Sequence, residues 1–422
     1  MLKVSVAVII GILLPLAAIA ASGQGFSFRA GVGYDFLSQQ YFVDSITVSG
    51  ADSVLTRWSL TSEYLDDLKG RFEVAFRQTG KSQLELRSLY EQTPEILKLK
   101  LNTDWRHETI LGELRWRSQV DWRGQYSGNR SDLGSYLSGS TVARVKKPVG
   151  FNTALWGQVQ GDITNFYDSA AYGYDHFRVG GKAGVEQTLG LLSMASLNGF
   201  YLARQVADSQ TLSYGSFGLE GSFSGSTSRL DIDLLSRWES KDHNRPDGEN
   251  DYSRFEADLM SRLALGERFF SRQRMGAEIT SYDPADLLNN GYQRYDLTLL
   301  GGVQLGGLEL AFGPYFELLR ATTDDTSSAE DYFEAAGMID IGYFSAQGMF
   351  VSLESRLGHR QLEYINEYQA NFIFYQLLLI TDWTILKRVN LNLLLSTEWE
   401  WHDETSYDNH ILLLSTGLTY AF

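Results

Sequence analysis

The sequence predicts an all-β fold, an antiparallel up-and-down β-barrel that is closed by its C-terminal strand. Apolar residues recur with period two through much of the chain, which is the spacing of a strand with one apolar face. The chain holds 23 Tyr, 23 Phe and 9 Trp against only 6 Pro, a composition that suits strands. After residue 20, no stretch approaches the roughly 18 consecutive apolar residues that a membrane helix needs.

The clearest strand pattern covers residues 410–422, in which Leu412, Leu418, Tyr420 and Phe422 lie on one face. Within this strand, the pattern polar-x-Gly-x-x-aromatic-x-aromatic is formed by Ser415, Gly417, Tyr420 and Phe422. It resembles the C-terminal assembly signal of bacterial outer-membrane β-barrels. An ordinary edge strand that ends there is the alternative interpretation.

The resemblance implies a transmembrane antiparallel up-and-down β-barrel in the outer membrane of a Gram-negative-type bacterium. Lipid of that membrane and the barrel assembly machinery are then the expected partners. A soluble β-sandwich or propeller would also show period-two alternation, with its apolar face buried inside. The terminal strand and the N-terminus favour a barrel whose apolar face contacts lipid.

The N-terminus reads as a signal peptide. Lys3 precedes an apolar run from Val4 to Ile19, and the segment 18–20 offers a small-x-small cleavage site. We therefore expect a signal peptide over residues 1–20 and a single barrel domain over residues 21–422. The chain has no cysteine, which excludes a disulfide framework, a lipidated cysteine and a thiolate metal site.

Period-two segments give the expected strands. The first is near 26–36, and others follow near 42–49, 53–65, 70–79, 82–92, 95–107 and 110–123. From residue 132 onward, tight turns are expected near 147–148, 189–190, 225–226, 266–267, 306–307 and 347–348. Longer loops are expected at 165–175, 241–251, 283–291, 322–331 and 401–409. Short turns that alternate with longer loops are typical of outer-membrane barrels, whose short turns are periplasmic, and the total is about 22 strands, in a range of 18–22.

Charge is unevenly distributed along the chain. Residues 21–150 carry 17 Lys and Arg against 15 Asp and Glu, whereas residues 151–422 carry 18 against 37. Six cations alternate with apolar residues on two consecutive expected strands and form a predicted basic strip in the barrel interior, or lumen: Lys98, Lys100, Arg106, Arg115, Arg117 and Arg123. Such a strip would guide an anionic solute or polymer, or would be neutralised by the carboxylates interleaved with it.

Sites for chemistry are sparse. The six histidines are scattered, and one alternative is an acid–base cluster at the loop rim, formed by His402 with Asp403, Glu404 and Asp408. No serine or threonine is marked as a nucleophile, so we expect no enzyme, no catalytic residue, no cofactor and no metal site. The loop at 242–248 departs from the calcium-binding loop pattern. A net charge of −16 argues against nucleic acid as a partner.

The chain resembles porins and secretion channels, which implies an outer-membrane channel for hydrophilic solutes or a polymer. An alternative is a barrel that sheathes or anchors a partner protein, such as a periplasmic plug, an electron carrier or an export component. A structural or adhesive surface barrel is a third class. Six tryptophans share faces with aliphatic residues and are expected to contact lipid: Trp105, Trp116, Trp122, Trp238, Trp399 and Trp401.

Overall fold

The computed structural model describes most of the chain. The described residues are 25–48, 54–80, 82–93, 96–110, 112–125, 135–167, 175–207, 209–243, 251–282, 291–321, 331–363, 371–402 and 408–421. For residues 26, 28, 35–48, 54–67 and 125 the description covers the backbone alone. The expected signal peptide at residues 1–20 and the final Phe422 lie outside the described residues.

The described residues form twenty strands and one short 3-10 turn, η2 (Gln210–Leu212). The strands are β1 (Gly25–Val48), β2 (Val54–Gln78), β3 (Ser82–Gln92), β4 (Ile96–Thr109), β5 (Gly112–Gln125), β6 (Tyr136–Pro148), β7 (Thr153–Phe166), β8 (His176–Thr188), β9 (Ser193–Val206), β10 (Tyr214–Ser226), β11 (Leu230–His243), β12 (Tyr252–Ala264), β13 (Phe269–Tyr282), β14 (Tyr292–Leu305), β15 (Leu308–Ala321), β16 (Tyr332–Phe344), β17 (Met349–Leu362), β18 (Phe372–Leu386), β19 (Val389–His402) and β20 (Asn409–Ala421). No helix in these ranges is long and apolar enough to cross a membrane.

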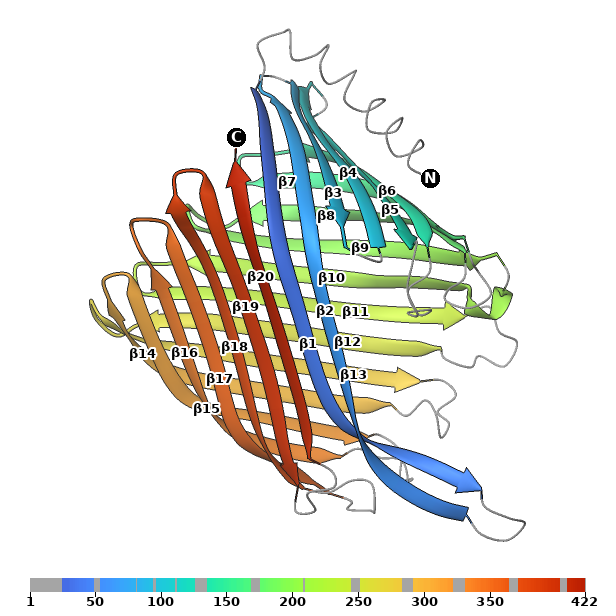
Figure 1. The fold of residues 1–422 in the computed structure, drawn as a ribbon. Helices are drawn as coiled ribbons and strands as arrows, with labels where there is room; N and C mark the ends of the chain where they lie inside the picture. Colours follow the sequence, from blue (N-terminus) through green and yellow to red (C-terminus); the bar gives the residue numbers. More distant parts are fainter. Residues whose placement is uncertain are drawn as a thin grey trace.

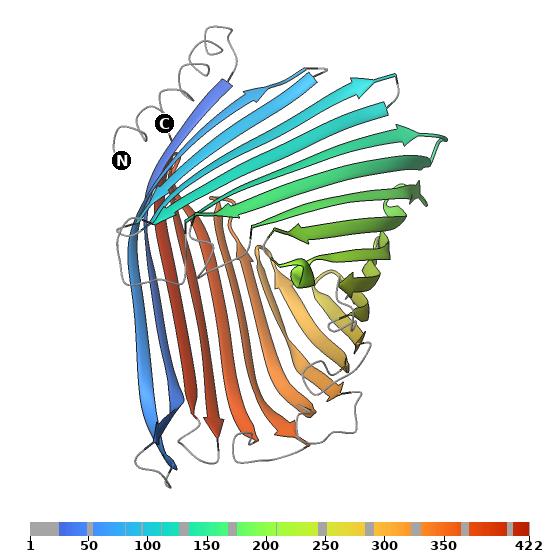
Figure 2. The same ribbon diagram turned by 90° about the vertical axis from the view of Figure 1, so that its right-hand side faces the viewer.

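The strands form one closed antiparallel barrel. Each strand pairs with the next along the chain, and β20 pairs with β1, from Arg29 opposite Ala421 to Gln40 opposite His410. Figures 1 and 2 show the sheet wrapping around so that the first and last strands lie side by side. The predicted closed barrel, with its C-terminal strand at the seam, is confirmed.

Twenty strands lie within the predicted range of 18–22. The count is two below the preferred number of 22, because two pairs of expected strands are each a single strand. The segments near 26–36 and 42–49 are both parts of β1, and those near 53–65 and 70–79 are both parts of β2. Polar residues between the two segments of each pair, such as Gln39 and Asp66, interrupt the period-two pattern and suggest a turn. Instead the backbone ladder continues through them, with Gln39 opposite Glu63 and Asp35 opposite Asp67.

β1 and β2 are the longest strands, at 24 and 25 residues, whereas β3 to β20 have 11 to 15. The pairing of β1 with β20 stops at Gln40, so residues 41–48 pair only with β2. This end of the β1–β2 hairpin therefore extends beyond the ends of its neighbours, as Figure 1 shows at its lower right.

The predicted alternation of connections is confirmed. The connections at 149–152, 189–192, 227–229, 265–268, 306–307 and 345–348 are short and lie at the end of the barrel that holds the C-terminus. The connections at 167–175, 244–251, 283–291, 322–331 and 403–408 are longer, and the strands that flank them end at the opposite side of the barrel. We call these ends the turn side and the loop side.

Apolar side chains cover the outside of the barrel. Leucine, valine and phenylalanine alternate outward along the strands and remain exposed, because lipid rather than protein would cover them. All six predicted tryptophans are on this outward face. Trp105 and Trp116 lie near the turn side, and Trp238, Trp399 and Trp401 lie near the loop side. Their positions match the two aromatic girdles of a membrane barrel.

In β20, Ser415 and Gly417 face the lumen, whereas Leu418 and Tyr420 face outward and are 44% and 41% exposed. The structure thus places the described part of the predicted assembly signal on a strand at the seam. Whether these residues direct assembly remains a prediction.

Candidate functional site: the charged lumen walls

The lumen face carries the charged side chains of the strands. Because neighbouring residues of a strand point to opposite faces, the outward apolar set leaves every second position pointing inward. Arginine, lysine and carboxylate residues occupy these inward positions on most strands, and ion pairs link them across adjacent strands or, as with Lys182 and Glu220, across one intervening strand. A closed barrel keeps these charges away from lipid and in contact with water.

The register between β4 and β5 divides the predicted basic strip into two groups. Lys98 lies opposite Arg123 near the loop side, with Lys100 next to them. Arg106 lies opposite Arg115 near the turn side, with Arg117 next along β5. Asn102 and Gln119 lie opposite each other between the two groups. The six cations therefore share one wall.

Half of the strip is paired with carboxylates. Arg115 Nε donates to Asp104 Oδ1 at 3.0 Å. Arg106 lies 3.2 Å from Glu113, and Lys98 lies 3.4 Å from Glu91. These pairs are open to water, since the Arg106 and Lys98 side chains are 42% and 45% exposed.

Lys100, Arg117 and Arg123 form no ion pair with any described residue. A hollow of about 500 Å³ lies beside Arg117, and neither Lys100 nor Arg123 lines it. Asn102, Gln119 and Arg117 contribute to its lining, together with polar side chains from β6 and β7. This part of the lumen offers amide and guanidinium donors to a solute.

A second charged wall lies on the lumen faces of β10 to β17, and we call it the paired wall. Glu317 on β15 is 5% exposed. Arg294 donates to both of its carboxylate oxygens, at 2.9 and 3.1 Å. The hydroxyls of Tyr315 and Tyr332 donate to the same carboxylate. A bidentate guanidinium and two phenols thus hold Glu317 in one position.

The neighbouring carboxylate, Glu334 on β16, is 4% exposed and lies opposite Glu317. Arg360 donates to Glu334 Oε2 from Nε at 2.9 Å and from Nη2 at 2.7 Å. The Arg360 guanidinium also lies 4.3 Å from the ring centroid of Tyr332 and 5.2 Å from that of Phe372. Packing between two rings fixes the orientation of this guanidinium.

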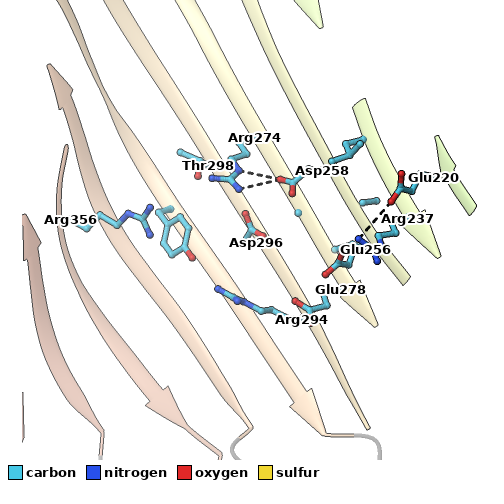
Figure 3. A pocket seen from close by; sticks show the side chains of 15 residues that line it. Glu220, Arg237, Glu256, Asp258, Arg274, Glu278, Arg294, Asp296, Thr298 and Arg356 are labelled. Carbon is cyan, nitrogen blue, oxygen red and sulfur yellow. Dashed lines mark hydrogen bonds and ion pairs between the residues drawn. The ribbon is translucent and has the colours of Figure 1, made fainter. Parts of the chain in front are cut away.

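A hollow of about 570 Å³ lies in the paired wall, within the size range of roughly 300–1,000 Å³ that is common for ligand pockets. Figure 3 shows its charged lining: Glu220, Arg237, Glu256, Asp258, Arg274, Glu278, Arg294, Asp296 and Arg356. Arg274 donates to Asp258 Oδ1 at 3.2 and 3.3 Å, and Arg237 lies 3.7 Å from Glu220. The guanidiniums of this pocket are therefore neutralised by neighbouring carboxylates.

Asp296 differs from the other carboxylates of the pocket, because it has no hydrogen bond or ion pair to another described residue. It lies between Arg274 and Arg294 in Figure 3 and lines the hollow. Its carboxylate covers Gly276 on the adjacent strand, where an added Cβ would lie 1.9 Å from Asp296 Oδ2. Glycine at this position makes room for the free carboxylate.

Aromatic rings line the loop-side end of the lumen. They occupy the first or last lumen-facing position of most strands from β6 to β19, and we call them the aromatic collar: Tyr136, Phe166, His176, Tyr214, His243, Tyr252, Tyr282, Tyr292, Tyr332, Phe372 and His402. Several are cross-strand pairs, such as Tyr252 and Tyr282, whose ring centroids are 5.8 Å apart. The Tyr292 hydroxyl donates to Glu278, which lines the pocket. The collar and the pocket therefore adjoin.

Short polar side chains at the ends of the loops close the same hairpins. The backbone N–H of Phe166 donates to Asp175 at 2.7 Å, that of Leu362 to Asn371 at 2.8 Å, and that of His402 to Asp408 at 2.8 Å. The same bond joins His243 to Asp251, Ala321 to Asp331, and Val206 to the hydroxyl of Ser213. Part of the acidic content of the loops thus stabilises hairpin ends.

This arrangement has a sequence signal that charge counting did not reveal. A Ser, Asp or Asn followed at once by a ring residue begins several strands that return from the loop side: Ser135-Tyr136, Asp175-His176, Ser213-Tyr214, Asp251-Tyr252, Asp331-Tyr332 and Asn371-Phe372. The first residue of each pair ends the loop and the second belongs to the collar. The repeat would have located the collar from sequence.

The structure describes only part of the acid–base cluster that the sequence suggests at His402. His402 Nε2 lies 3.9 Å from Glu400 Oε2, and Asp408 binds the His402 backbone. Asp403 and Glu404 lie outside the described residues. Across the described ranges, His, Asp and Glu form no group that could hold a metal ion.

Comparison with protein families and with curated proteins gives no match. Solved structures do match. The siderophore receptor PirA from Pseudomonas aeruginosa has a TM-score of 0.53 at 9% identity, over 93% of this chain and 80% of that one. The FrpB iron transporter from Neisseria meningitidis, in its apoprotein form, has a TM-score of 0.57 at 11% identity, over 94% and 81%. OpdQ from Pseudomonas aeruginosa has a TM-score of 0.48 at 9% identity, over 94% and 98%.

At these identities the matches establish the fold alone. PirA and FrpB are similar to this chain over nearly its whole length, and both are β-barrels of the outer-membrane type. The resemblance read from the C-terminal strand is therefore confirmed as a fold: the chain is a closed antiparallel barrel of the outer-membrane class.

Proposed function

We propose that the chain is an outer-membrane channel that passes hydrophilic solutes or a polymer, either as a porin-like pore or as an export pore. The main support for this proposal is the contrast between the two faces of the barrel. The outer face is apolar and carries the tryptophans, whereas the lumen face is charged and contains hollows. Barrels of 16 to 18 strands already enclose an aqueous channel, so a twenty-stranded barrel has room for one.

The basic strip supports a preference for anions near β4 and β5. Lys100, Arg117 and Arg123 have no ion pair with a described residue, so the carboxylates that lie opposite Lys100 and Arg117, Asp121 and Asp104, offset their fields only in part. Cations beside a low-dielectric wall raise the local concentration of anions. The preference should weaken as salt rises, because the Debye length falls from about 10 Å at 0.1 M to about 3 Å at 1 M.

Conductance in a planar lipid bilayer tests this proposal. The purified barrel should conduct ions, and changing Arg115, Arg117 and Arg123 to Glu should shift the reversal potential toward cation selectivity. The matched control is the exchange Arg115→Asp with Asp104→Arg, which keeps the net charge of the wall and should leave the reversal potential close to that of the wild type. A barrel that does not conduct contradicts the channel. If the barrel conducts but its ion selectivity is unchanged in the triple variant, the anion-guiding role of the strip is contradicted and the channel proposal still holds.

One observation favours the second candidate, a barrel that anchors a partner protein. Three successive turns on the turn side carry fully exposed apolar side chains: Ile110 is 102% exposed, Phe151 109% and Leu191 102%. Exposed apolar groups of this kind often mark an interaction site. Under this candidate, a soluble protein should co-purify with the barrel, and changing all three residues to Ser should release it.

The outer-membrane location is tested through the C-terminal strand. Changing Tyr420 and Phe422 together to Ala should leave the chain unassembled in the periplasm, because both aromatics of the proposed assembly signal are lost. Loss of heat-modifiable mobility on a gel would report the failure. Changing the lumen-facing Thr419 to Ala is the control and should not affect assembly. Normal surface assembly of the double variant would contradict the proposed signal.

A further inference from the structure

We propose that the pocket in the paired wall, together with the adjoining part of the aromatic collar, is a binding station for an uncharged oligosaccharide. This inference rests on the proposed channel function and specifies one class of solute that the channel would take. It is carried by three features of the lumen: the ion pairing of the charges in the pocket, the one lining carboxylate that has no bond to a described residue, and the rings that border the pocket.

The guanidiniums of the pocket are already paired with carboxylates. Arg274 donates to Asp258, Arg294 binds Glu317 through both oxygens, and Arg356 donates to Glu354 at 2.8 Å. An anion would have to compete with these carboxylates, and a cation would have to compete with these guanidiniums. A neutral polyol can instead bind the outer edges of the paired groups and leave each pair intact.

Donors and acceptors alternate over the floor of the pocket. Guanidiniums and carboxylates come from β10 to β17, and adjacent strands are about 4.8 Å apart, so both kinds of group recur within the width of a sugar ring. Each hydroxyl of a sugar both donates and accepts, which matches such a surface. A solute with hydroxyls on every side gains hydrogen bonds in several orientations as it moves along the wall.

Asp296 supplies the strongest acceptor in the pocket. Its carboxylate has no bond to a described residue, and it points into the hollow between Arg274 and Arg294 in Figure 3. The flanking guanidiniums reduce its attraction for a cation. Its two oxygens remain available to a pair of vicinal hydroxyls, and a hydrogen bond to a charged acceptor is stronger than one between neutral groups.

The collar provides the apolar part of the site. Tyr292 lies on the same strand as Asp296 and Arg294 and is linked through its hydroxyl to Glu278. Tyr252 and Tyr282 pair on the adjacent strands β12 and β13. The apolar C–H face of a sugar ring packs against aromatic rings, while its hydroxyl edge faces polar groups. A ring border beside a polar floor fits both faces of a saccharide.

Maltotriose is a suitable probe, because it is uncharged and carries hydroxyls on every ring. Added to the wild-type barrel in a planar bilayer, it should reduce the ion current in a concentration-dependent way. Saturation-transfer NMR on the detergent-solubilised barrel should detect the same contact without any conductance. Asp296→Ala should weaken binding about tenfold or more, the effect of losing a hydrogen bond to a charged group. Gly276→Ala should also weaken binding, because the new Cβ displaces the Asp296 carboxylate.

Two controls make the test specific. Thr419→Ala, on β20 and outside the pocket, should bind maltotriose as the wild type does, and heat-modifiable mobility should confirm that each variant assembles. The cationic trisaccharide of glucosamine should bind more weakly than maltotriose. The saccharide site is overturned if maltotriose causes neither current reduction nor saturation transfer. It is also overturned if the Asp296 and Gly276 variants bind maltotriose with the affinity of the wild type. A conducting barrel without maltotriose binding leaves the channel standing, whereas NMR binding to a barrel that does not conduct leaves the site standing and removes the channel.

Discussion

The two charged walls of the lumen use the same residue types in different ways. On β4 and β5 the ion pairs are open to water, as with Arg106 and Glu113, which are 42% and 40% exposed. On β14 to β17 the carboxylates of Glu317 and Glu334 are nearly covered. An exposed pair contributes little stability and leaves its field in the lumen, whereas a covered pair is costly to break and contributes little field. The basic strip is therefore suited to attraction at a distance and the paired wall to contact.

The largest contrast should appear when one partner of a covered pair is removed. Arg360→Ala leaves the Glu334 carboxylate buried without its guanidinium, and we expect a loss of about 3–5 kcal/mol in the free energy of unfolding. The matched variant in the basic strip, Lys98→Ala, removes a side chain that is 45% exposed and should cost no more than about 1 kcal/mol. Urea titration of barrels refolded in lipid vesicles measures both. Equal losses would contradict the distinction between the walls.

The phenols around Glu317 should give the next largest effect. Tyr315→Phe and Tyr332→Phe each remove a donor to a buried carboxylate, and each should destabilise the barrel by about 1.5–3 kcal/mol. Because both hydroxyls serve one acceptor, the double variant should depart from additivity. Tyr295→Phe is the control, since that hydroxyl donates to a neutral partner, Gln293, on the outward face. The same urea titration reports all four variants, and strict additivity would show that Glu317 does not couple the two phenols.

A smaller effect separates the walls by their response to salt. Arg106→Ala should cost less than about 1 kcal/mol at 0.1 M salt and almost nothing at 1 M, because an exposed pair is screened. The cost of Arg360→Ala should persist at 1 M, since a covered pair is screened much less. Unfolding curves at the two salt concentrations provide the test. A salt-sensitive Arg360 variant would place that pair in open water.

The smallest effect concerns the outer face that both walls share. Brominated lipid should quench tryptophan fluorescence, because Trp116, Trp238, Trp399 and Trp401 are exposed on the outward face. Trp156 faces the lumen, where Arg144 lies 4.6 Å from its ring centroid. Trp156→Phe should therefore leave quenching by brominated lipid unchanged. A fall in lipid-phase quenching in that variant would mean that the two faces of the sheet are assigned the wrong way round.

The outer face of the barrel could be predicted from sequence because it depends on period two alone. The same rule separates the six tryptophans from the six cations of the basic strip, and the register of β4 and β5 places the cations on the lumen face. It failed within β1 and β2, where polar residues near Gln39 and Asp66 suggest turns although the backbone ladder runs through them. Local composition cannot reveal that a polar segment is paired with another polar segment far along the chain.

The paired wall was beyond prediction for a related reason. Arg294 and Glu317 are on different strands, and their contact depends on the register between β14 and β15. A shift of one residue would turn every side chain of a strand to the opposite face. Sequence shows that both residues face the lumen but not that they meet. The collar is different, because the repeated polar-ring pairs at loop ends were visible in the chain and needed only to be compared with one another.

The seam between β1 and β20 governs the order of events as the barrel forms. Every other strand pair joins neighbours along the chain and can form as a hairpin, whereas the seam joins Arg29 to Ala421 and must wait for nearly the whole sheet. Contacts between such distant residues form slowly, because the chain must lose much of its freedom before they form. During that interval two strand edges carry unpaired amides, which are costly in lipid and prone to pair with other chains. The lifetime of the open sheet, more than the strength of either lumen wall, should therefore set the yield of folded barrel.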